Sequence, residues 1–219
     1  MSEEPIGISS ASSGTVILAN RGTKQGEGVN IQYTTFPNNK PLEYANQFFV
    51  WESDSPNIPW DRDPIARVPV GQDQYTFTQF VKFNYQVGVG YVIGYAVAND
   101  PAAICSSIFY PANEQPGQGQ QLKMAMGSYG PGYVEVSYDT LQQYNPVANH
   151  NYIAIWQAPQ ASYKGGEMSA ASIQYPNTHG QATIMNVNLQ INSTYSIGYF
   201  MQKAPEGKSA LASELTFTT

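Results

Sequence analysis

The residues best suited to chemistry lie in one loop, from Asp54 to Asp63. Three carboxylates and an asparagine fall within this loop, and oxygen ligands of this kind are the ones that calcium prefers. The loop also places Trp60 beside Asp61, an arginine and Asp63, which offers an aromatic plane flanked by hydrogen-bonding groups. Sugars are held in this manner, so we predict that Trp60, Asp61 and Asp63 bind a ligand. The structural alternative is that Trp60 anchors a long loop and the arginine pairs with an aspartate.

A second loop, which follows the matching strand later in the chain, carries Tyr163 and Lys164. The two loops differ in sequence although the strands around them agree. A functional site grafted on a common scaffold produces this pattern, because loops vary more freely than the strands that carry them. We therefore add Tyr163 to the predicted ligand-binding residues.

The remaining reactive side chains do not assemble into catalytic patterns. His150 and His179 are the only histidines, both fall in predicted turns, and neither has a cysteine or histidine at the spacing of a zinc site. Cys105 lies in a predicted strand and is expected to be a small core residue. We predict a protein that is not an enzyme and that uses no cofactor and no metal.

Composition narrows the choice of partners. The chain has 219 residues, only 10 lysines and arginines, and a net charge of −6. Nucleic-acid binding is not expected, because phosphate backbones are bound through clustered basic residues. The charged fraction is only 12%, so the surface must owe its polarity to amide, hydroxyl and tyrosine side chains. A single cysteine rules out a disulfide within the chain.

The sequence shows no targeting or membrane signal. No stretch approaches the roughly 18 uninterrupted apolar residues that a membrane helix needs. The first residues are acidic and lack the basic segment and apolar run of a secretory signal peptide. We expect a soluble protein that is cytoplasmic as synthesised, and whose export would need a route other than a classical signal peptide.

The chain contains an internal repeat. Tyr33 and Trp51 recur as Tyr138 and Trp156 at an offset of 105 positions, and further pairs follow the same spacing. After a shift of one position, Tyr91 and its neighbours recur at Tyr195. Two copies of one folding unit are therefore expected. We predict a flexible terminus over 1–13, a first domain over 14–111, a linker over 112–120 and a second domain over 121–219.

Each copy reads as a set of short strands bounded by glycine and proline turns. The predicted strands are 15–19, 29–34, 47–51, 65–70, 75–83, 89–97, 104–109, 122–126, 133–140, 152–157, 168–175, 182–191, 195–202 and 211–218. About seven strands per hundred residues indicate an all-β protein made of two tandem immunoglobulin-like antiparallel β-sandwiches.

Two residue types sharpen this fold prediction. In immunoglobulin-like domains a tryptophan on the third strand packs in the middle of the core, and Trp51 and Trp156 occupy that strand. A tyrosine at the start of the sixth strand hydrogen-bonds back to the preceding backbone, and Tyr91 and Tyr195 occupy that position. We expect these four aromatic residues to be structural.

The second copy also resembles the SKICH-type immunoglobulin-like modules in its strand pattern. The matching stretches are Asn151–Trp156, with sequence Asn-Tyr-Ile-Ala-Ile-Trp, and Thr194–Tyr199, with sequence Thr-Tyr-Ser-Ile-Gly-Tyr. Weaker versions occur in the first copy, and the resemblance covers about a third of each domain. It implies a fold and an interaction role, and it transfers no catalytic residue.

The function predicted from the sequence is non-catalytic binding of a glycan or another neutral polar ligand through loop aromatics. One alternative is a structural protein that self-assembles into homo-oligomers through edge strands, because few charges oppose such pairing. Another alternative is a protein-binding module of a secreted effector or virulence factor.

Overall fold

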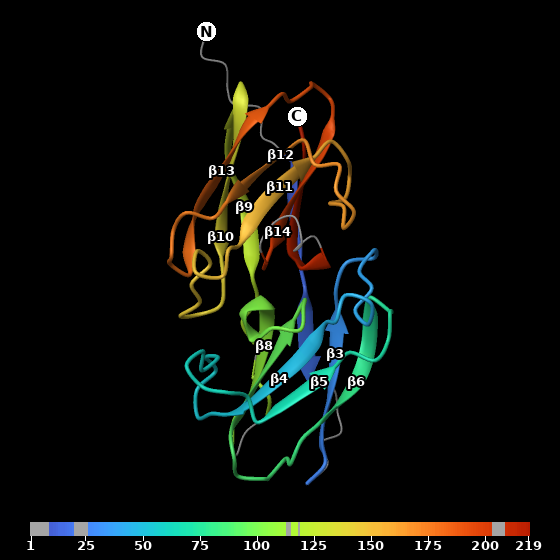
Figure 1. Cartoon of the computed structure of the whole chain (residues 1–219), viewed down its shortest axis with the longest axis vertical. Helices are drawn as coiled ribbons and strands as arrows, with labels where there is room; N and C mark the ends of the chain where they lie inside the picture. Colours follow the sequence, from blue (N-terminus) through green and yellow to red (C-terminus); the bar gives the residue numbers. More distant parts are fainter. Residues whose placement is uncertain (1–8, 20–25, 113–114, 118, 203–208) are drawn as a thin grey trace.

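A computed structural model describes residues 9–19, 26–112, 115–117, 119–202 and 209–219, and it is all-β (Figure 1). Helical structure among these residues is limited to short 3-10 turns. The first half of the chain contributes β1 (Ser10–Gly14), β2 (Val16–Ala19), β3 (Gly28–Thr34), β4 (Gln47–Glu52), β5 (Ala66–Pro69), β6 (Thr76–Lys82), β7 (Tyr91–Ala96), the helix η1 (Pro101–Ala103) and β8 (Ile104–Tyr110).

The second half repeats this order. It contributes β9 (Lys123–Gly130), β10 (Gly132–Asp139), β11 (Tyr152–Trp156), β12 (Ser169–Ser172), β13 (His179–Val187), β14 (Thr194–Phe200) and β15 (Leu211–Thr218). Each of the fourteen predicted strands overlaps one of the strands β2 to β15, so the all-β prediction is confirmed. The strand β1 was not predicted.

Each half has two antiparallel sheets that face each other. The first half pairs β2-β3-β6 in one sheet and β5-β4-β7-β8 in the other. In the second half the corresponding sheets are β13-β10-β9 and β1-β15-β14-β11-β12. Tyr33 of β3 meets Phe48 of β4 and Tyr95 of β7 across the layer between the sheets, at ring distances of 6.2 and 5.4 Å. The core of the first half therefore lies between its two sheets.

The tyrosines at the start of β7 and β14 make the predicted hydrogen bonds. The backbone N–H of Gln86 donates to the Tyr91 hydroxyl at 3.1 Å, and that of Gln190 donates to the Tyr195 hydroxyl at 2.6 Å. In each case the tyrosine lies five residues after its partner. The tyrosine corner is confirmed in both halves.

The two repeated tryptophans are buried, but they do not lie between the sheets as predicted. Side chains alternate along β11, so Ile153 and Ile155 face the inter-sheet core and Trp156 faces outward. The loop that follows the strand covers each ring. Trp51 Nε1 donates to the carbonyl of Arg62 at 3.0 Å, and Trp156 Nε1 donates to that of Gly165 at 3.1 Å. Both tryptophans thus hold a loop on the outer face of a sheet.

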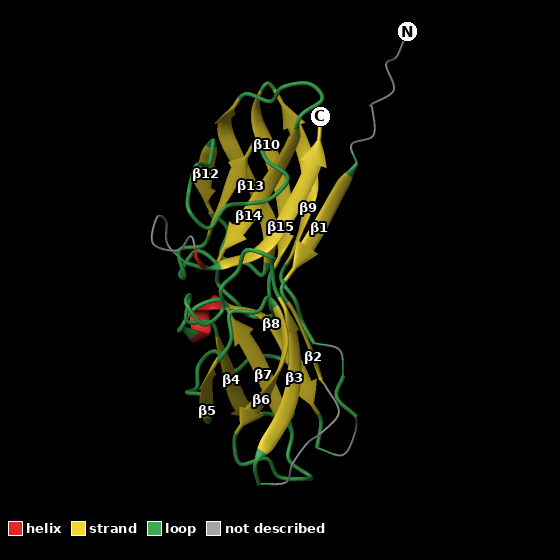
Figure 2. Cartoon of the chain, turned by 90° about the vertical axis from the view of Figure 1, so that its right-hand side faces the viewer, coloured by secondary structure: helices red, strands yellow, loops and turns green. Residues whose placement is uncertain are grey.

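The two halves exchange their first segments. β1 leaves the first half and pairs antiparallel with β15, the last strand of the second, while β2 returns to β3 (Figure 2). The frayed terminus predicted for 1–13 is therefore wrong for residues 10–13, and residues 1–8 lie outside the described part of the chain. Each unit contains a segment that completes a sheet of the other.

A segment of the second copy also pairs with a strand of the first half, at positions equivalent to those of β1 and β15. The segment before β9, which includes the end of the predicted linker 112–120, hydrogen-bonds to β8, the last strand of the first half, and Ser107 N donates to Gln120 O at 2.8 Å. Leu122 N donates to Cys105 O at 2.8 Å, and Thr15 N donates to Ala212 O at 3.1 Å. Both the donors and the acceptors of these two bonds are 107 positions apart. The crossings are thus reciprocal, and they meet at Gly14, where an added Cβ would lie 2.6 Å from Gln121 Nε2 and 3.0 Å from Leu122 O.

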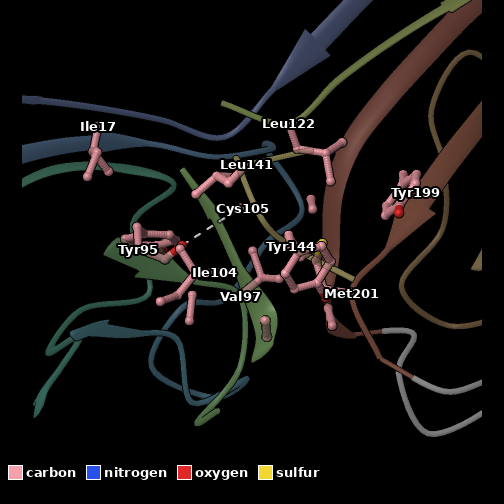
Figure 3. Packing of buried hydrophobic residues seen from close by; sticks show 14 of the residues in the cluster. Ile17, Tyr95, Val97, Ile104, Cys105, Leu122, Leu141, Tyr144, Tyr199 and Met201 are labelled. Carbon is pink, nitrogen blue, oxygen red and sulfur yellow. Dashed lines mark hydrogen bonds between the residues drawn. The ribbon is translucent and has the colours of Figure 1, made fainter. Parts of the chain in front are cut away.

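A continuous apolar cluster joins the halves at these crossings. Figure 3 shows Cys105, Leu122, Leu141, Tyr144 and Met201 gathered between the two sandwiches. All five side chains are at most 2% exposed. The halves are consequently in direct apolar contact at a buried waist.

Candidate functional site

The predicted ligand residues Trp60 and Tyr163 occupy equivalent places in the two halves. Each lies two residues before the carbonyl that accepts the hydrogen bond of the repeated tryptophan, Arg62 in the first half and Gly165 in the second. Each ring also reaches across the waist to a tyrosine in the other half. The two residues thus mark two junctions between the halves.

The junction at Trp60 is closed. The Trp60 ring packs on Tyr144 at 5.1 Å, and its Nε1 donates to the carbonyl of Gln142 at 2.9 Å. Next to it, Gln120 Nε2 donates to Asn57 Oδ1 at 2.7 Å, and the Tyr144 hydroxyl donates to the carbonyl of Ala102 at 2.6 Å. The single hydrogen-bond donor of the Trp60 side chain and part of its ring are therefore engaged in the contact between the halves.

The two predicted aspartates lie on the surface of the same loop as Trp60. Asp61 and Asp63 are exposed, and Asp63 Oδ1 lies 3.6 Å from Arg67 Nη2 in a surface ion pair. Among the described residues no cluster of three histidine, cysteine, aspartate or glutamate side chains is arranged to hold a metal ion. The loop thus places a half-buried tryptophan beside solvated carboxylates.

The junction at Tyr163 is open. The Tyr163 ring stacks on Tyr44 of the first half, with centroids 5.3 Å apart and an interplanar angle of 24°. A groove of about 520 Å³ runs beside this pair. Its walls are Asn38, Lys40 and Tyr44 from the first half and residues 158–164 from the second. This volume lies within the range of small-molecule sites.

Neutral hydrogen-bonding groups line most of this groove. Asn38 Nδ2 donates to Gln160 Oε1 at 3.1 Å and so bridges the halves along one wall. Lys40 Nζ lies 2.6 Å from Glu43 Oε2, which balances its charge and raises the pKa of the ammonium through the hydrogen bond. The groove therefore combines aromatic surface with amides and hydroxyls, and Lys164 adds a positive charge at its rim.

Tyr163 is the link between the groove and the interior. Burial, and then the nearby carboxyl of Glu214, raise the pKa of its phenol well above the ordinary value. Its hydroxyl is buried and has no hydrogen-bond partner among the described residues. A buried polar atom without a partner is uncommon in folded proteins and marks a place where a ligand group or a water can bind.

The remaining reactive residues stay apart from the groove. His150 and His179 are exposed. His150 and its repeat equivalent Ala45 have the same left-handed backbone, with φ of 54° and 53°. The position therefore serves the same turn in both halves. Cys105 is fully buried, its thiol lies 3.7 Å from the carbonyl of Tyr95, and burial raises its pKa to about 12.

Sequence reasoning missed the first-half wall of the groove. Asn38 and Tyr44 lie in a proline-containing turn, and nothing in their local pattern indicates that the second half packs against them. The sequence signal that could have found this contact is the equivalence of Trp60 and Tyr163. It is hidden because the loop after Trp51 is two residues longer than the loop after Trp156. Once the loops are aligned at their ends, the two rings coincide.

The comparisons with known proteins add no assignment. No protein-family model matches the chain, and the search of curated proteins gives no significant match. In the part of the chain that the structure describes, no helix has the length and apolarity to cross a membrane. The geometry of the two junctions is therefore the remaining guide to function.

Proposed function

We propose that the protein is a non-catalytic binding protein for a carbohydrate, and that the ligand occupies the groove beside Tyr44 and Tyr163. The observation that carries the proposal is the difference between the two equivalent junctions. Trp60 spans one junction through its hydrogen bond to Gln142, while a groove of about 520 Å³ lies beside Tyr163 at the other. Such a difference between the copies at a loop is what a binding site on a duplicated scaffold would look like.

The chemistry of the walls favours a neutral, hydroxyl-rich ligand. A sugar offers CH groups to an aromatic face and hydroxyls to amides, and the groove supplies Tyr44, Asn38, Gln160 and Ser162 for these roles. The predicted participation of Tyr163 is retained in this proposal. Trp60, Asp61 and Asp63 are not included, because the tryptophan is engaged with Gln142 and Tyr144.

The test is binding of the full-length chain to a panel of oligosaccharides, measured by glycan array and then by calorimetry. We expect Tyr44→Ala to weaken binding at least tenfold, because it removes the half-exposed ring of the stacked pair. Trp60→Phe is the matched control. It changes an aromatic residue at the closed junction and should leave the affinity unchanged.

Two results would overturn the proposal. One is that no saccharide binds the wild-type chain at millimolar concentration. The other is that Tyr44→Ala binds as tightly as the wild type while its circular dichroism and melting temperature confirm that it is folded.

A further inference from the structure

A small chamber lies next to the groove and shares four of its wall residues. It has a volume of about 10 Å³, which is close to the space that one water-sized group needs. Asn38, Gln160, Ala161 and Tyr163 line both the groove and the chamber. The hydrogen bond between the exposed amides of Asn38 and Gln160 is part of this shared wall. Opening one exposed hydrogen bond would connect the two spaces.

The chamber contains a carboxyl group with no cationic partner. Glu214 lies on β15, between β14 and β1, and only 9% of it is exposed. Its Oε2 accepts a hydrogen bond from the backbone N–H of Ala161 at 2.6 Å. Among the described residues no lysine, arginine or histidine forms an ion pair with it. A buried carboxylate without a countercharge is costly, so the chamber favours a proton or a cation.

The chamber also contains the unpartnered hydroxyl of Tyr163. Burial keeps this phenol protonated, and the neighbouring carboxyl raises its pKa further. Its oxygen can accept a hydrogen bond, and no described residue donates one. The chamber therefore offers one carboxylate and one phenol oxygen to a small group with several donors.

We infer that this chamber is a subsite for the primary ammonium of an amino sugar, whose ring lies in the groove. This inference depends on the carbohydrate function proposed above. An ammonium group is about the size of a water and carries three donors. One donor would meet the Glu214 carboxylate, a second would meet the Tyr163 oxygen, and a third would take an amide oxygen released when the Asn38–Gln160 bridge opens. An acetylated amine is neutral and too large for this chamber.

The experiment compares two matched ligands by calorimetry, at a pH where a sugar amine is protonated. One is a β-1,4-linked oligosaccharide of N-acetylglucosamine, and the other is its fully de-N-acetylated counterpart. We expect the wild-type chain to bind the free amine at least tenfold more tightly. In Glu214→Gln this preference should disappear, while the acetylated ligand binds as before.

Asp61→Asn is the control for general electrostatics. It removes the same charge from an exposed residue outside the groove, so the preference for the free amine should survive in it. Equal binding of both ligands by the wild type, or a preference that persists in Glu214→Gln, would overturn the inference and leave the carbohydrate proposal standing. If neither ligand binds and no other saccharide on the panel does, both proposals are overturned.

Discussion

The hydroxyl of Tyr199 donates to Oδ1 of Asn151 at 3.0 Å, and both groups are buried. The first half repeats this pair, since the Tyr95 hydroxyl donates to Asn46 Oδ1 at 2.9 Å. There the acceptor has a second donor, because Asn39 Nδ2 lies 2.9 Å from the same oxygen. The tyrosine is thus one of two side-chain donors to the asparagine oxygen in the first half, whereas in the second half Tyr199 donates to Asn151 Oδ1 without a second side-chain donor among the described residues.

This difference predicts unequal costs for the same substitution. Tyr199→Phe leaves Asn151 Oδ1 buried without its tyrosine donor, which should lower the free energy of unfolding by about 1–3 kcal/mol. Tyr95→Phe should cost about 1 kcal/mol or less, because Asn39 still donates to Asn46. Urea denaturation of both variants checks the order, with the exposed Tyr175→Phe as a neutral control. Equal costs would contradict the reasoning.

The crossing at Gly14 gives a second prediction. Gly14→Val would push a branched side chain against Gln121 and the backbone of Leu122, and should destabilise the chain by about 1–3 kcal/mol. Gly71 is the matched control, since an added Cβ there has no heavy atom within 4 Å. Gly71→Val should change the unfolding midpoint little. If Gly14→Val melts at the wild-type temperature, the close approach of the crossing segments is not important for stability.

Glu214 predicts a pH dependence of stability. Burial raises its pKa from an ordinary value of 4.5. A carboxyl with a raised pKa in the folded state stabilises the fold below the unfolded pKa, and this contribution is lost as pH rises through the folded pKa. The wild type should therefore lose stability relative to Glu214→Gln as pH rises from below about 4.5 toward 7.

Chemical denaturation of both chains across that pH range measures this difference directly. Subtracting the variant removes the contribution of the other carboxylates, provided that they titrate alike in both chains. A difference that is flat with pH, or that grows in the opposite direction, would show that Glu214 titrates normally in the folded chain.

Cys105 should be unreactive in the folded chain. With a pKa of about 12, only about one thiol in ten thousand is ionised at pH 8, and the group is buried as well. A colorimetric thiol reagent should label no cysteine in native protein within an hour and one per chain in denaturant. Rapid labelling of the native chain would show that the waist between the halves opens.

Most of the strands could be predicted from the sequence, because strand alternation and turn residues are local signals. The repeat at Trp51 and Trp156 located the third strand in each half, and the corner tyrosines were assigned correctly. The direction of the tryptophans was wrong, because one-residue alternation decides which face a ring occupies and both faces of β4 and β11 are buried. An apolar run covered on both sides does not show which face is the core.

The contact between the halves could not be predicted from local sequence patterns. The Ser-Ala-Ser-Ser-Gly sequence of β1 has no apolar pattern, and it is a strand only because β15 offers an edge to pair with. Trp60 was identified as a residue with a role, but its partner Tyr144 lies 84 positions further along the chain. Such distant pairings arise from the assembled fold rather than from any window of sequence.

The reciprocal exchange of segments has a consequence for how the molecule comes apart. If the second sandwich melts, β1 loses the strand it pairs with; if the first melts, the residues before β9 lose theirs. Neither sandwich can be lost without exposing apolar surface of the survivor at Cys105, Leu122 and Leu141. Heating should therefore give one calorimetric peak whose van't Hoff enthalpy equals the calorimetric enthalpy of the whole chain. Two independently folding copies would give two transitions.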